Sequence, residues 1–91
     1  MDIIVKKLTE AEYRKMGVQN WPIWEKEISL FDWRYDEKEQ FFLIEGEVKI
    51  KTKEAEYNVQ PGDFVVCPKG LVCEWKITKY VKKHYQFVGE P

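Results

Sequence analysis

What the sequence has little of already limits what this protein does. Among its 91 residues there are one histidine and two cysteines, and the 15 basic and 16 acidic side chains leave a net charge of −1. Neither sign of charge gathers in one segment, so the chain has no basic patch for nucleic acid or an anionic membrane surface. No apolar run reaches the ~18 residues of a membrane span, and an N-terminus with Asp2 and no apolar core does not resemble a signal peptide. We therefore expect a cytoplasmic protein without a nucleic-acid or membrane partner.

The two cysteines, Cys67 and Cys73, are expected to be free thiols, because nothing indicates secretion and cytoplasmic thiols stay reduced. They flank the turn from Pro68 to Gly70, so a bridge across a hairpin stays open as the alternative. The length lies just below the commonest domain size, which predicts a single domain over residues 1–91.

One short helix is predicted near the N-terminus. Thr9 and Glu12 have the spacing of a capping box, in which the hydroxyl and the carboxylate satisfy backbone donors at a helix start. Gly17 is a natural stop, which leaves about two helical turns. Everything after Trp21 is expected to be β structure.

The remaining chain alternates between apolar and polar residues, as half-buried strands do. Between residues 23 and 35 the apolar parity changes, which implies a bulge or bend near Ser29 to Asp32. Glu39, Phe41 and Leu43 share one parity and should face one side of a strand. With a turn at Glu45-Gly46, the pattern predicts eight or nine short strands in a β-sandwich or barrel. The later strands are expected at residues 48–52, 56–59, 64–67, 72–78 and 81–88.

Glycine and proline recur at a spacing that carries a family resemblance. Gly62, Pro68 and Gly70 precede Cys73, and upstream Glu39 is followed after six residues by Gly46. These two halves resemble the motifs of the cupin family, an all-β double-stranded β-helix or RmlC-like jelly-roll barrel. A narrower likeness, over roughly residues 18 to 88, is to the small single-domain cupins grouped with ureidoglycine aminohydrolase. It rests on the segments 21–25, 31–33, 44–46, 61–63 and 83–85.

The resemblance implies one interior cavity around Trp33, Tyr35, Glu39 and Cys73. In a typical cupin, three histidines and the glutamate hold a divalent Mn, Fe or Zn there, and the narrower group implies metal-dependent hydrolysis of a ureido compound with release of ammonia. Trp33, Tyr35 and Cys73 stand where the histidines would be, so three of the four usual ligands are missing. Since metal sites usually have three or four donors, a metal here would need Glu39, Cys73 and His84 together.

Each candidate residue also has a plainer interpretation. Glu39, the best candidate for a catalytic base, is alternatively a buried structural acid or a ligand contact. Cys73 is alternatively an inert packing residue, because free cysteine is commonly buried. Parity places Lys83 and Tyr85 on the inner face and His84 on the opposite, more polar face, which predicts an exposed histidine. Lys83 and Tyr85 are pocket candidates, or a lysine at the barrel mouth and a core tyrosine.

We predict a single cupin domain whose cavity binds a small polar molecule and needs no metal cofactor. Trp33 and Trp75 either stack on the ligand or fill the core, whereas Trp24 is expected to pack. Whether the protein is an enzyme stays open, with a metal-dependent hydrolase and a structural homodimer as the alternatives. The predicted ligand-binding residues are Trp33, Tyr35, Glu39, Cys73, Trp75, Lys83 and Tyr85.

Overall fold

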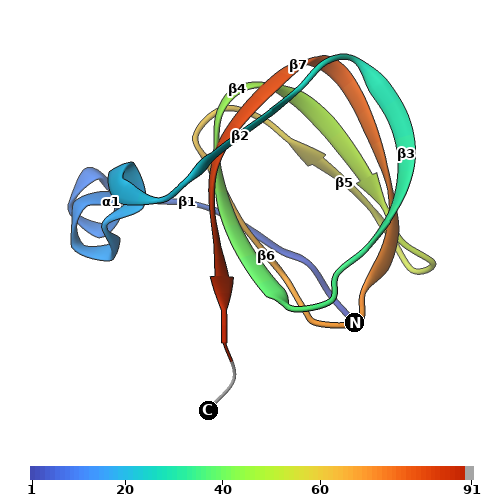
Figure 1. Cartoon of the computed structure of the whole chain (residues 1–91), viewed down its shortest axis with the longest axis horizontal. Coiled ribbons are helices and arrows are strands. Elements are labelled where there is room, and N and C mark those ends of the chain that lie inside the picture. The colour runs from blue at the N-terminus through green and yellow to red at the C-terminus, as the bar shows by residue number, and fades with distance from the viewer. Residues whose placement is uncertain (90–91) are drawn as a thin grey trace.

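The computed structural model describes residues 1–89, and its seven strands curl into a small barrel with one short helix outside it (Figure 1). Every strand pair is antiparallel. The fold class expected from the sequence is therefore confirmed. No helix within residues 1–89 has the length and apolar character needed to cross a membrane. The elements are β1 (Ile4–Lys7), α1 (Glu10–Met16), the 3₁₀ turn η1 (Val18–Asn20), β2 (Ile23–Lys26), β3 (Ser29–Arg34), β4 (Lys38–Lys51), β5 (Glu56–Val59), β6 (Asp63–Cys67) and β7 (Val72–Val88).

Two long strands form the frame of the barrel. β4 and β7 pair with each other along most of their lengths. The far edge of β7 carries β3 and β2, and the far edge of β4 carries β6 and β5, with β1 added beyond β6. β4 and β7 both run the length of the barrel. Inward side chains from the two strands can therefore meet in one interior.

The turn predicted at Glu45-Gly46 is wrong, because β4 runs through it as a bulge. The register of β4 against β7 shifts between Leu43 and Val48, and Gly46 has a φ of 99°. A Cβ at Gly46 would collide with the backbone of Tyr80 on β7. Glycine at this position lets β4 bend without ending. Its partner β7 also continues as one strand over Val72–Val88, where two strands, 72–78 and 81–88, were predicted.

The parity change between residues 23 and 35 has a related cause. β2 ends at Lys26 and β3 begins at Ser29, so the change falls at Glu27 and Ile28, slightly before the predicted bulge. Both strands pair with β7. The two-residue interruption lets each strand present its own aromatic side chains to the interior.

The helix is as predicted. The Thr9 hydroxyl accepts a hydrogen bond from the Glu12 amide at 3.1 Å, and the Thr9 amide donates to Glu12 Oε1 at 3.0 Å. Gly17 ends the helix in the left-handed conformation with a φ of 70°. The helix and η1 cover a small second core of Val18, Trp21 and Phe64 on the outer side of the sheet.

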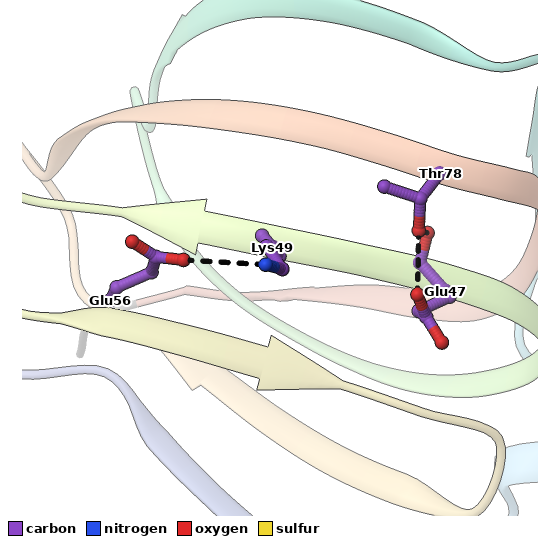
Figure 2. Close-up of polar contacts among 4 residues, drawn as sticks. All are labelled: Glu47, Lys49, Glu56 and Thr78. Carbon is purple, nitrogen blue, oxygen red and sulfur yellow. Dashed lines mark hydrogen bonds and ion pairs between the residues drawn. The ribbon is translucent and has the colours of Figure 1, made fainter.

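The outer face of β4 carries cross-strand polar contacts (Figure 2). The Thr78 hydroxyl on β7 donates to Glu47 Oε1 at 2.8 Å, and Lys49 Nζ lies 3.9 Å from Glu56 Oε1 on β5. The inward residues Val48 and Ile50 are fully buried. The alternation expected for residues 48–52 is thus confirmed, with one wet face and one face in the core.

Candidate functional site

A cavity of about 790 Å³ lies inside the barrel, a size typical of small-molecule sites. Its lining comes mostly from β2, β3 and the inner face of β7, so it lies on the side of the barrel that the two short strands form. The lining residues are Trp24, Glu25, Lys26, Glu27, Ser29, Leu30, Phe31, Asp32, Trp33, Tyr35, Glu39, Trp75, Lys83, Tyr85 and Phe87.

An ion pair forms the polar centre of this cavity. Lys83 Nζ on β7 lies 2.8 Å from Glu39 Oε2 on β4, and both side chains are 7% exposed. Strand parity directs both residues inward, because Glu39 shares a face with Phe41 and Leu43, both fully buried. Two charges removed from water require each other, since either one alone would carry its full desolvation penalty.

Aromatic rings enclose the ammonium group of Lys83. Its Nζ lies 4.4 Å from the ring centre of Phe41, 4.8 Å from those of Trp24 and Trp75, and 5.9 Å from that of Tyr85. Ring faces attract a cation, so these contacts partly replace lost hydration. Burial lowers the pKa of Lys83, and the Glu39 carboxylate opposes that change. The amine therefore releases its proton more readily than a surface lysine does.

Tyr35 is held in place by the turn that contains the Pro68-Lys69-Gly70 motif. Its amide donates to the Leu71 carbonyl at 2.9 Å, and its carbonyl accepts from the Gly70 amide at 2.7 Å. Its hydroxyl is buried and has no hydrogen-bond partner within residues 1–89, and the same holds for Trp75 Nε1. Burial, chiefly, raises the pKa of Tyr35, with the nearby Cys67 and Glu39 adding to it. The Tyr35 hydroxyl therefore stays neutral.

The mouth of the cavity is apolar, with an acidic rim. Leu30, Trp33 and Phe87 are 63%, 50% and 52% exposed. Four charged residues border them, and three of the four are acidic. They are Glu25, Lys26, Glu27 and Asp32.

Six of the seven predicted ligand-binding residues line this cavity, and Cys73 is the exception. Cys73 is buried in the main core, opposite Trp33 in the β3–β7 pairing. Burial raises the pKa of its thiol to about 11, which favours the packing interpretation. Cys67 and Cys73 are both free thiols.

The prediction of an exposed His84 is wrong. Its side chain does lie on the face opposite Lys83, but Trp21 from the segment after η1 covers that face. His84 Nδ1 lies 3.0 Å from the Trp21 carbonyl oxygen, and the residue is only 9% exposed. Periodicity gave the correct face but carried no information on what covers it.

The donors required for a cupin metal centre do not converge here. Glu39 is paired with Lys83, Cys73 lies outside the cavity lining, and His84 is on the other side of β7. Within the described part of the chain, no three His, Cys, Asp or Glu residues come together as a metal site would require. The residues present therefore do not fit the metal that the fold family implies. An ammonium group supplies the positive charge beside the glutamate.

Sequence reasoning missed the enclosure of Lys83 and part of the cavity wall. Trp24 was expected only to pack. It does pack edge-on against Trp75 at 5.9 Å between ring centres, but it also faces the cavity. Phe31 and Phe87 line the cavity as well. The available signal was Lys83 itself, a cation on the strand face that it shares with Tyr85 and Phe87, because a cation on an inward face requires a buried partner.

Comparison with known proteins gives a consistent result. The family model for the EutQ-like cupin domain matches residues 14–85. A DUF861 family protein from Thermotoga maritima superposes with a TM-score of 0.93 at 41% identity, over 96% of this chain and 100% of that one. The Clostridium difficile EutQ protein aligns with a TM-score of 0.65 at 19% identity, over 91% of this chain and 64% of that one. A putative ethanolamine utilization protein Q from Salmonella typhimurium aligns with a TM-score of 0.63 at 18% identity, over 93% of this chain and 68% of that one.

The last two likenesses show the fold alone. No curated protein matches the chain. The cupin resemblance read from the glycine and proline spacing is confirmed, whereas the likeness to the ureidoglycine aminohydrolase group stays a prediction.

Proposed function

We propose, for a chain that belongs to the EutQ-like cupin domain family, that the barrel cavity binds a small, neutral, polar molecule that has a flat apolar part. The observation that carries this proposal is the buried Glu39–Lys83 pair at the centre of an aromatic cavity. Binding in this proposal requires no metal, because the ion pair supplies the polar contacts.

The ion pair selects against charged ligands. Glu39 and Lys83 together have no net charge, so an anion attracted by the ammonium is repelled by the adjacent carboxylate. At ~4 Å and an effective dielectric constant of about 20, each of these terms is about 4 kcal/mol, and they nearly cancel. The anion would still lose its hydration. A neutral group with a donor and an acceptor close together, such as an amide, a ureido group or a carbonyl, meets both partners without that loss.

The walls favour a flat ligand. Phe31 stacks near Trp75 with ring centres 6.0 Å apart and an angle of 22° between ring planes, and Trp24 stands edge-on to the same indole. Rings prefer offset stacking and edge contacts with other rings. The acidic rim adds to the discrimination, because it repels anions before they enter.

The test uses four probes that share one ring. Benzamide, benzyl alcohol, benzoate and benzylamine are titrated into the protein and followed by backbone amide NMR shifts. We expect saturable shifts at β2, β3 and β7 residues with the two neutral probes, and none with benzoate. No saturable shift with any probe, or tightest binding of benzoate, would overturn the proposal.

A charge-altering variant sharpens this test. Glu39→Gln keeps the shape of the side chain and removes its charge, which leaves the Lys83 ammonium without its counter-ion. The preference should then reverse, with benzoate binding better than benzamide. Lys26→Met is the matched control, because it removes a rim charge beside the same cavity without touching the pair, and it should keep the preference for neutral probes.

A homodimer is the second candidate, favoured by apolar exposure in β3 and in the connection just before it. Ile28 and Leu30 are 68% and 63% exposed, and within residues 1–89 β3 pairs only with β7. An edge strand with apolar side chains is suited to pairing with another chain. Sedimentation at tens of micromolar tests this. A dimer that Leu30→Lys dissociates supports it, and a monomer rejects it.

A further inference from the structure

We propose that Lys83 is a nucleophilic amine that forms an imine with a neutral aldehyde or ketone held in the cavity. This deepens the proposed function and rests on it, because the carbonyl compound is the neutral polar ligand. Lys83 combines three features that imine-forming lysines need: access to a cavity, an apolar surrounding and an adjacent proton carrier.

Access and surroundings follow from the position of Lys83 on β7. Its side chain is 7% exposed and contributes to the cavity lining. Lys26 also lines the cavity, but its side chain is 37% exposed and its Nζ lies 3.8 Å from Glu27 at the rim. The two lysines therefore share one cavity and differ in burial, which makes Lys26 an internal reference for reactivity.

Glu39 provides the proton carrier. Its Oε2, 2.8 Å from Lys83 Nζ, is within the distance at which a general base takes a proton directly. Burial lowers the pKa of Lys83, so less free energy is needed to generate the free amine than at an exposed lysine.

The reaction balances with these two residues and the carbonyl compound alone. Glu39 takes a proton from the Lys83 ammonium, and the free amine attacks the carbonyl carbon, forming the C–N bond and breaking the C=O π bond. A proton passes from the nitrogen to the alkoxide to give a carbinolamine. Glu39 then returns its proton to that hydroxyl, which leaves as water while the C=N bond forms. Ammonium plus carbonyl thus become protonated imine plus water, with no oxidant or reductant.

The cavity favours the product of this reaction. The protonated imine carries the same positive charge as the ammonium, so its ion pair with Glu39 is kept. The faces of Trp24, Phe41 and Trp75 continue to stabilise a cation at that position. The apolar walls limit the return of water, which is the reactant that would reverse the reaction.

The experiment traps the imine. The protein is incubated with benzaldehyde and sodium cyanoborohydride, and adducts are counted by intact mass and located by peptide mapping. We expect one fast adduct, at Lys83, whose rate of formation saturates with benzaldehyde concentration, and slower labelling at Lys26 and the surface lysines. Glu39→Gln should slow trapping at Lys83 by on the order of 100-fold, the lower end of what general acid–base catalysis contributes.

The variant Lys83→Arg separates reactivity from folding. Arginine keeps the positive charge beside Glu39 but forms no imine, so the folded variant should lose the fast adduct and keep the slow labelling of surface lysines. Its fold is checked by circular dichroism and by thermal unfolding. Lys49→Met is the matched control, because Lys49 lies on the outer face of β4 and outside the cavity lining; it should trap benzaldehyde at Lys83 at the wild-type rate.

Failure of this proposal is distinguishable from failure of the proposed function. Benzyl alcohol and benzamide report noncovalent binding without any reductant. If they bind in the cavity while benzaldehyde labels only surface lysines, the imine proposal is overturned and the binding proposal stands. If no probe binds and Lys83 is not labelled, both are overturned.

Discussion

Removing one partner of the Glu39–Lys83 pair should destabilise the protein far more than removing both. Lys83→Met leaves the Glu39 carboxylate in a site where its side chain is 7% exposed. Breaking a buried pair in this way costs about 3–5 kcal/mol, because the remaining charge keeps its desolvation penalty. For a domain with a total stability of about 5–15 kcal/mol, that is a large fraction.

The double variant Lys83→Met/Glu39→Leu should recover most of this loss. It replaces the pair with apolar side chains of similar length beside Trp24, Phe41 and Trp75, which already surround the site. Such replacements are often neutral or stabilising, by about 1–4 kcal/mol relative to the pair. The expected coupling between the two positions is therefore several kcal/mol, well above the usual limit for exposed ion pairs.

The exposed pair in Figure 2 is the matched control. Lys49 and Glu56 are also on paired strands, but their atoms are 3.9 Å apart and their side chains are 44% and 51% exposed. The cycle Lys49→Met/Glu56→Leu should give a coupling of about 0–1 kcal/mol, because water screens the charges.

Urea unfolding of the wild type and the six variants, followed by tryptophan fluorescence, measures both cycles. The free energy of unfolding comes from linear extrapolation, with the slope checked for constancy. A coupling at Glu39–Lys83 no larger than that at Lys49–Glu56 would refute the reasoning, since it would mean that water reaches the pair.

Three further predictions concern the rest of the barrel. Burial raises the pKa of Cys67 from 9.0 to about 12, so above pH 9 the unfolded state loses the thiol proton and the folded state keeps it. The free energy of unfolding of the wild type, relative to that of Cys67→Ala, should therefore fall as the pH rises from 9 towards 12, by up to about 1.4 kcal/mol per pH unit in urea melts. A difference that does not change with pH would contradict this. Gly46→Ala should lower the free energy of unfolding by more than about 2 kcal/mol, because Gly46 has a positive φ and a Cβ there would collide with Tyr80. The control Gly89→Ala has open space around it and should change the free energy of unfolding by no more than about 0.5 kcal/mol in the same melts. Thr9→Ala should lower stability by about 1 kcal/mol through the lost cap, and an unchanged midpoint would show that α1 adds nothing to global stability.

Local patterns in the sequence determined the fold class and, with the family resemblance, six of the fifteen residues that line the cavity. Alternation fixes which residues of a strand share a face, so parity alone grouped Glu39 with Phe41 and Leu43, and Lys83 with Tyr85. The family resemblance placed Glu39 in the interior. The capping box at Thr9 and the stop at Gly17 depend only on neighbouring residues, and both were predicted correctly. The glycine and proline spacing indicated the cupin barrel because turns demand those residues locally.

Tertiary structure decided everything that depends on which strands meet. Gly46 looks like a turn in sequence, but pairing with β7 keeps β4 continuous and turns it into a bulge. The outward face of His84 is covered by Trp21, 63 positions earlier in the chain. Glu39 and Lys83 are 44 positions apart. In the β4–β7 pairing Glu39 lies opposite Phe87 and Lys83 opposite Leu43, so their charges meet only because both side chains extend into the same barrel interior. Sequence periodicity predicts the face of the strand on which each side chain lies. The partner that the side chain contacts depends on how distant strands pair and close into the barrel.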